Sequence, residues 1–283
     1  MAFNVKTFYT RATTALIFAA VLLGCVWYSY YSFVAFFTVV GFIGLFEFYK
    51  ISEILGTKPN KTFGYLLYGI LSIITIYVFS GISNEVYVIM SLVYAFGALS
   101  LLFAFLLFLI ELFKKEGSLN NVAFTILSFL YVVIPCFLLI AIVGALGKFQ
   151  PYKILGMIFF VWINDTGAYL VGSFIGNHKL YERISPNKTW EGTLGGIAFC
   201  IGLSYVVHLI FPQLPLVHWV AISVIVAVFG TLGDLVESML KRQAGVKDSG
   251  SLMPGHGGVL DRFDSLFFAT PFVFCYLAIM GLL

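Results

Sequence analysis

The sequence predicts an all-α polytopic integral membrane protein of about nine transmembrane helices. Hydrophobic residues make up 61% of the 283 residues and charged residues only 10%, whereas a soluble domain contains roughly 45–50% apolar residues. Apolar stretches of about 20 residues, the length that crosses the hydrocarbon core of a bilayer, recur along the whole chain. The composition therefore excludes a water-soluble globular fold.

Each predicted span is an apolar run bounded by polar or charged residues, at 12–30, 32–49, 64–82, 86–110, 122–146, 154–175, 192–211, 217–237 and 265–282. The first two are separated only by residues 27–32, whose aromatic side chains suit an interfacial turn. The next three are rich in Phe, Tyr and Leu and are interpreted as lipid-facing and packing surface. The span at 192–211 begins with a small-residue face that favours close helix packing.

The distribution of cations predicts the orientation of these spans. Fourteen of the 16 Lys and Arg residues fall on one face of the predicted topology, and only Lys148 and Lys153 lie opposite. Cytoplasmic loops carry an excess of Lys and Arg, so we expect a cytoplasmic N-terminus, an outside C-terminus and residence in the cytoplasmic membrane. The net charge of +3, without a basic run interleaved with aromatic residues, gives no reason to expect nucleic acid binding.

The chain is predicted to be one membrane domain, 1–283, with unequal halves. Residues 1–150 contain no aspartate and are expected to form a lipid-facing scaffold, in which Glu47 and Glu53 are expected to be interfacial. The alternative is that these two glutamates touch the active side. Residues 151–283 contain all five aspartates and are expected to form the catalytic half. Paired broken helices in both halves, as in inverted-repeat transporters, are not found in the sequence.

Asp234 stands inside an apolar span, where a carboxylate costs roughly 2.5–3.5 kcal/mol on insertion scales and needs a partner or a wet cavity. Glu237 and Ser238 follow at i+3 and i+4 and therefore share its helix face. This stripe could bind a divalent cation or a polar headgroup. The alternative is an intramembrane ion pair between Asp234 and a cation from another helix.

Asp261 and Asp264 form a second acidic pair at the entry to the last span. For Asp264 a capping role in the first helical turn is an alternative. Four carboxylates from two adjacent helix ends could hold two cations roughly 3.5–4 Å apart. Mg²⁺ prefers such oxygen ligands and leaves positions open for substrate phosphates.

A glycine-rich and cationic loop joins the two acidic pairs. Its glycines allow backbone amides to approach a ligand closely, as in phosphate-binding loops, although the loop does not match a Walker A motif. His256 could orient a phosphate or act as an acid or base, and a purely structural role is equally compatible. The residues expected to bind substrate phosphates here are Lys241, Arg242, Lys247, His256, Gly257, Gly258 and Arg262.

A second polar segment lies upstream of this loop. Asp165 sits at the centre of the span at 154–175, where an ionisable residue indicates a functional site. After that span, Ser185, Lys188 and Thr189 could bind a phosphate or a base. The alternative is that they form a turn and the N-cap of the next helix.

These motifs together resemble a known signature. The pattern Ser238-x-x-Lys241-Arg242, then Lys247-Asp248, Pro254-Gly255-His256-Gly257-Gly258 and Asp261-Arg262-x-Asp264 is similar to that of phosphatidate cytidylyltransferases, also called CDP-diacylglycerol synthases. Segments around Asp165, Lys188 and Asp234 also resemble this family. The resemblance covers about residues 162–264; before them only the hydropathy agrees.

The resemblance implies the reaction CTP + phosphatidate → CDP-diacylglycerol + diphosphate. It also implies Mg²⁺, with a second ion that could be monovalent, membrane lipids as surroundings, a homodimer, and a polar cavity open to the cytoplasm. Asp234 and Asp261 become the leading metal ligands, supported by Asp264, Asp165 and Glu237. The catalytic residues implied are Asp234, Asp261, Lys241 and Arg262.

Three other functions are alternatives to this one. A CDP-alcohol phosphotransferase would carry a run of Asp and Gly on consecutive helical turns, which the chain lacks. A related synthase acting on an archaeal ether-lipid phosphate stays open. A cation-coupled transporter using Asp165 and Asp234 would leave the polar pattern from Ser238 to Asp264 unexplained.

Overall fold

The computed structural model describes residues 5–79, 86–144, 149–253, 255 and 257–283. Helices dominate it: α1 (Val5–Tyr28), α2 (Tyr30–Ile54), α3 (Lys61–Phe79), α4 (Val86–Leu112), α5 (Leu119–Ser128), the π-helical segment η1 (Phe129–Val133), α6 (Ile134–Gly144), α7 (Tyr152–Ile175), α8 (Trp190–Ile210), α9 (Leu216–Gln243) and α10 (Leu260–Ile279). Between α7 and α8 lies a hairpin of two strands, β1 (Lys179–Tyr181) and β2 (Ser185–Thr189).

The described helices form nine rods, because α5, η1 and α6 run continuously. Six of these rods are long and apolar enough to cross a membrane, and the described parts of the other three contain shorter apolar stretches at 12–28, 61–76 and 97–112. The prediction of an all-α polytopic membrane fold is thus confirmed. The rods agree with the nine predicted spans to within a few residues over most boundaries.

The π-helical segment in the fifth rod has a local cause. Pro135 has no backbone N–H and cannot bond to the carbonyl of Tyr131, four residues earlier. A single widened turn is a common way for a helix to continue past such a defect. Neither this turn nor its position was predicted from the hydropathy.

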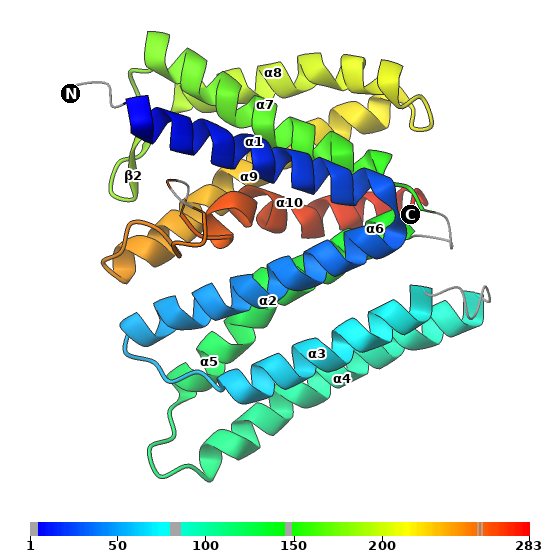
Figure 1. Ribbon diagram of the computed structural model, residues 1–283, viewed down its shortest axis with the longest axis vertical. Helices are drawn as coiled ribbons and strands as arrows, with labels where there is room; N and C mark the ends of the chain where they lie inside the picture. The colour runs from blue at the N-terminus through cyan, green and yellow to red at the C-terminus, as the bar shows by residue number, and fades with distance from the viewer. Residues whose placement is uncertain (1–4, 80–85, 145–148, 254, 256) are drawn as a thin grey trace.

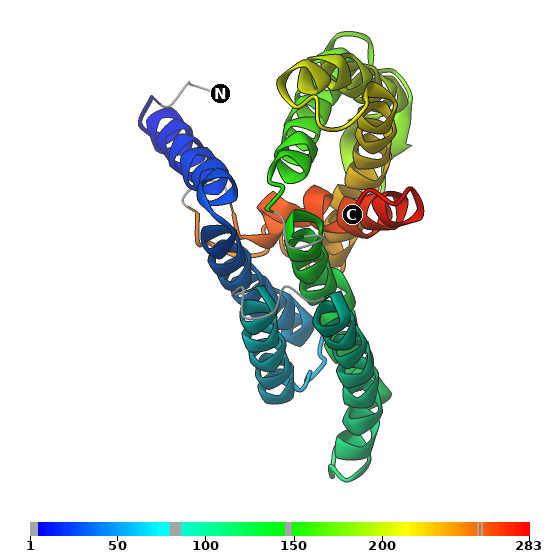
Figure 2. The same ribbon diagram turned by 90° about the vertical axis from the view of Figure 1, so that its right-hand side faces the viewer.

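The helix α10 occupies the middle of the structure, as Figure 1 shows. It packs on α9 along one side and on α6 along the other, while α7, α8 and α9 form a group of their own. The helices α3 and α4 lie furthest from α7–α9 in both views (Figures 1 and 2). Phe263 of α10 packs edge-on against Phe18 of α1 and Phe37 of α2, with ring centroids 5.7 and 5.9 Å apart.

The hairpin and the loops after α2, α4 and α9 lie at the same end of the rods (Figure 1). The start of α1 lies at this end and the end of α10 lies at the other. The predicted topology places these four loops on one face of the membrane, and the structure has them at one end of the helices. The side of the membrane that each end faces stays a prediction.

The hairpin was not predicted as strands, because its segments are short, polar and interrupted by Pro186. The strands pair antiparallel, with Tyr181 opposite Ser185. The predicted N-cap is present: Thr189 Oγ1 accepts a hydrogen bond of 3.1 Å from the backbone N–H of Gly192. This cap satisfies an amide at the start of α8 that has no partner within the helix.

The close packing of Gly156 of α7 against Trp219 of α9 allows a test of how these two helices pack. A Cβ atom at this position would lie 2.3 Å from the ring of Trp219, a side chain that is fully buried. Overpacking of this kind costs about 1–3 kcal/mol. We therefore expect Gly156→Ala to lower the midpoint of thermal unfolding in detergent.

The matched control is Gly202→Ala in α8, where an added Cβ meets no atom within 4 Å. Ala is favoured over Gly in a helix by about 1 kcal/mol, so this variant should unfold at or above the wild-type temperature. A Gly156→Ala protein as stable as the Gly202→Ala protein would contradict the packing of α7 against α9.

Candidate active site at the ends of α9 and α10

Lys241 joins the two helices that carry the acidic pairs. Its Nζ lies 2.5 Å from Glu237 Oε2 on its own helix and 2.6 Å from Asp261 Oδ1 on α10. The lysine side chain is 12% exposed and the two carboxylates are 1% and 6% exposed. The sequence predicted Lys241 as a phosphate ligand, and the structure adds an ion pair between the helix ends.

Asp234, Glu237 and Asp264 form a group of three carboxylates whose ligand oxygens lie within 4.8 Å of one another. Glu237 and Asp264 are buried. Lys241 is paired in charge with Glu237 Oε2, but neither Glu237 oxygen has a hydrogen-bond partner among the described residues. Buried carboxylates at this spacing repel one another, and an oxygen-preferring divalent cation would fit the group.

Asp261 lies in a different environment, because its second oxygen is surrounded by donors from the loop. Oδ2 accepts hydrogen bonds from the backbone N–H of Ser249 at 2.9 Å, from Ser249 Oγ at 2.9 Å and from the N–H of Gly258 at 2.7 Å. Gly257 has φ +81°, and a Cβ there would lie 2.4 Å from this oxygen. Part of the glycine-rich loop thus closes around Asp261, while Asp261 as a metal ligand stays a prediction.

Asp234 connects the two polar segments that the sequence analysis singled out. Lys188 of β2 forms an ion pair with Asp234 Oδ2, and Ser238 Oγ donates to Oδ1 at 3.2 Å. An ion pair was foreseen as an alternative to metal binding, and one is present, but its cation comes from the strand β2 and not from another helix. Both side chains are partly exposed, at 26% and 34%, so both remain accessible to a ligand.

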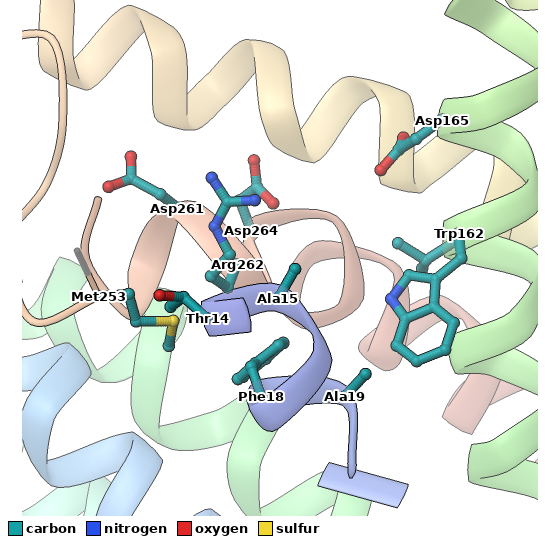
Figure 3. A pocket seen from close by; sticks show the side chains of 11 residues that line it. Thr14, Ala15, Phe18, Ala19, Trp162, Asp165, Met253, Asp261, Arg262 and Asp264 are labelled. Carbon is teal, nitrogen blue, oxygen red and sulfur yellow. The ribbon is translucent and has the colours of Figure 1, made fainter. Parts of the chain in front are cut away.

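Two cavities border these groups. The first, of about 310 Å³, lies between α1, α7 and α10 and is shown in Figure 3. Its polar side is formed by Asp165, Asp261, Arg262 and Asp264, and its apolar side includes Phe18 and Trp162.

The second cavity, of about 240 Å³, lies between α7, β2, α8 and α9. It is lined by Lys188, Thr189, Thr193 and Asp234 among others, and Asp165 borders both cavities. The predicted residues of the two segments thus form one continuous polar region, even though they are up to 99 residues apart in sequence.

Three of the remaining predicted site residues lie outside the two cavities. Arg242 and Lys247 are exposed, and Ser185 is half-buried on β2. None of these three residues is among the described residues that line the two cavities. His256 lies outside the described residues.

Glu47 has the position foreseen only as the alternative, in contact with the active side. It was expected at the interface, but it is 3% exposed and accepts hydrogen bonds from Ser249 Oγ and from the backbone of Val259 and Leu260. Glu53 pairs with Lys61 at 2.6 Å and is 47% exposed, as expected of an interfacial residue. The signal that could have found Glu47 is its place inside an apolar run, where ionisable residues indicate function.

Comparison with known proteins extends this picture to the whole chain. A model of the Cytidylyltransferase family matches residues 9–280. The chain is 42% identical over 184 residues to the phosphatidate cytidylyltransferase of Bacillus subtilis (strain 168), an alignment that covers 64% of this chain and 68% of that one.

Staphylococcal proteins of the same name are similar. The identity over 160 residues is 45% for Staphylococcus aureus (strain COL) and 44% for Staphylococcus saprophyticus, covering 56% of this chain and 60% of each relative. The chain thus spans less than two thirds of the length of these two relatives. With the match across residues 9–280, the chain belongs to the Cytidylyltransferase family and is a nucleotidyltransferase.

Proposed function

We propose that the protein is a phosphatidate cytidylyltransferase, which converts CTP and phosphatidate to CDP-diacylglycerol and diphosphate in phospholipid synthesis. The observation that carries the proposal is a group of eight charged residues, in which four carboxylates and two cations border two adjoining cavities and an ion pair lies beside them. The residues that border the cavities are Asp165, Asp234, Asp261 and Asp264, with Lys188 and Arg262, and the ion pair is formed by Glu237 and Lys241. The relatives named phosphatidate cytidylyltransferase support the same activity.

In this reaction a phosphate oxygen of phosphatidate attacks the α-phosphorus of CTP. The bond between this phosphorus and the oxygen that bridges to the β-phosphate breaks, and diphosphate leaves. Both reactants are anions, so their approach requires cations at the site. The attacking phosphate is already ionised near neutral pH, so no strong general base is needed. Positioning and electrostatic stabilisation can provide most of the rate enhancement.

The two cavities differ in a way that suits the two substrates. The first has apolar walls from α1 and α7 and polar groups at one side, including Arg262, which suits a lipid with an anionic headgroup. The second is bordered by the hairpin and the start of α8, with Lys188 and Thr189, which suits a nucleotide phosphate. We assign phosphatidate to the first and CTP to the second, with Asp165 between them.

The carboxylates of Asp234, Glu237 and Asp264 would hold Mg²⁺, with Asp165 and Asp261 nearby. When bound, this cation would neutralise phosphate charge and stabilise the charge on the leaving diphosphate. If all eight groups named above are ionised, five carboxylates against three cations leave a formal charge of −2, which one divalent cation would balance. A second, monovalent ion is also part of the proposal.

The chain's own cations have separate tasks. Lys241 holds Glu237 and Asp261 at fixed distances and places a positive charge beside the carboxylate group. Arg262 borders the first cavity, where a guanidinium can grip a phosphate through two hydrogen bonds. Arg242 at the end of α9, together with Lys247 and His256 of the loop, would bind phosphates of the incoming CTP.

The membrane setting also belongs to the proposal. The site would face the cytoplasm, where CTP is dissolved, while phosphatidate stays in the cytoplasmic membrane. The N-terminus would be cytoplasmic and the C-terminus outside. Residues 151–283 would form the catalytic half, residues 1–150 would support it, and two chains would form a homodimer.

The purified protein should release diphosphate only when CTP, phosphatidate and Mg²⁺ are all present. Glu237→Gln removes one buried negative charge without changing the side-chain shape, and we expect it to lower kcat at least about 100-fold. The control is Glu116→Gln, since Glu116 is 81% exposed and pairs with Lys58 outside the site. Wild-type activity in Glu237→Gln, or full activity after chelation of divalent cations, would contradict the metal assignment.

The assignment of the two cavities predicts opposite effects on the two Michaelis constants. Ala15→Phe would fill part of the first cavity and should raise the KM for phosphatidate about tenfold with little effect on that for CTP. Lys188→Gln removes a charged ligand from the second cavity and should raise the KM for CTP by about tenfold. The reverse pattern in initial-rate measurements would show that the substrates are assigned to the wrong cavities.

A further inference from the structure

Glu47 brings the N-terminal half of the chain into contact with the site loop. It lies on α2 and is 3% exposed. Its Oε1 accepts a hydrogen bond of 3.0 Å from the N–H of Val259, and its Oε2 accepts one of 2.9 Å from the N–H of Leu260. These partners are more than 200 residues away in sequence, so the contact joins the two halves directly.

The two backbone donors are at the start of α10. The first amides of a helix have no partner within the helix, and the N-cap residue of α10, Val259, offers no side-chain cap of its own. Glu47 supplies the missing acceptor from another helix. Its negative charge also suits the positive end of the helix dipole of α10.

Ser249 links Glu47 to Asp261. Its Oγ lies 3.1 Å from Glu47 Oε2 and 2.9 Å from Asp261 Oδ2, and its single hydroxyl proton can be donated to one of them at a time. The backbone also approaches Glu47 closely, because a Cβ on Gly250 or on Gly258 would lie 2.4 Å from Oε1. The loop is therefore folded around two carboxylates, Glu47 from α2 and Asp261 from α10.

We propose that Glu47 is a positioning residue for cytidylyl transfer. It holds the two ends of the loop, at residues 249–250 and 258–260, together with the first turn of α10, and so fixes Asp261, Arg262 and Asp264 relative to the acids of α9. This inference rests on the proposed function, because the contact would position groups that take part in that reaction. It also gives α2, in the half of the chain that was expected to form a scaffold, a role in the site.

The test separates positioning from a contribution to folding alone. In Glu47→Gln an amide NH₂ replaces one carboxylate oxygen and faces donors, so the loop loses an acceptor. We expect kcat to fall roughly 10–100-fold, the range found for groups that orient metal ligands. We also expect the Mg²⁺ concentration for half-maximal activity to rise several-fold in protein that remains folded.

Two further variants sharpen the comparison. Glu47→Asp keeps the charge and should recover part of the lost activity. Glu53→Gln changes an exposed glutamate on the same helix, outside the site, and should leave activity and Mg²⁺ dependence at wild-type values. A Glu47→Gln protein whose Mg²⁺ dependence is unchanged, with only the folded fraction reduced, would overturn the positioning role.

Hydrogen–deuterium exchange gives a readout that does not depend on activity. The amides of residues 249–250 and 258–260 should exchange faster in Glu47→Gln than in the wild type, while those of the middle of α7 should not change. Unchanged exchange in this loop would overturn the proposal even if activity fell. If the wild type released no diphosphate from CTP and phosphatidate, the proposed function would fail instead, and the exchange data would still show whether Glu47 holds the loop.

Discussion

The site depends on one buried ammonium group, that of Lys241. Taking an ion out of water costs several kcal/mol even after relaxation of the protein, so Lys241 needs counter-charges at close range. It has two, Glu237 on its own helix and Asp261 on α10, at 2.5 and 2.6 Å. Because the second partner lies on another helix, the ion pairs fix where α9 ends relative to where α10 begins. Removing either carboxylate would leave a buried charge with only one partner.

The same constraint explains why the acids are arranged in two environments. Asp261 is neutralised by Lys241 and by loop donors, and so can serve as a fixed point around which the glycine-rich loop closes. Asp234, Glu237 and Asp264 have fewer donors, and neither oxygen of Glu237 has a hydrogen-bond partner among the described residues. A chain that is 61% hydrophobic can keep such a concentration of charge only where each group has a partner or water. The partners therefore come from α2, α9, α10 and β2 together.

Much of this could be predicted from the sequence, for physical reasons that are local. Hydropathy depends on the composition of each segment alone, so the nine membrane spans could be predicted from it. The pairing of Glu237 with Lys241 also follows from i,i+4 spacing on one helix. The pairing of Lys188 with Asp234 could be foreseen only as an ion pair with a cation from another helix, because the partner depends on how the hairpin lies against α9. Glu47 was foreseen at the active side only as an alternative for the same reason, since its partners are more than 200 residues away. The π-helical turn and the short hairpin were missed because neither has a periodic pattern.

In the proposed reaction Asp234, Glu237 and Asp264 hold a divalent cation beside the reacting phosphates. The most direct test is a crystal structure of the protein with Mn²⁺ in place of Mg²⁺, with anomalous scattering used to locate the metal. We expect an anomalous peak within coordination distance of carboxylate oxygens from all three residues. A well-ordered peak coordinated elsewhere, with these three carboxylates free of metal, would contradict it.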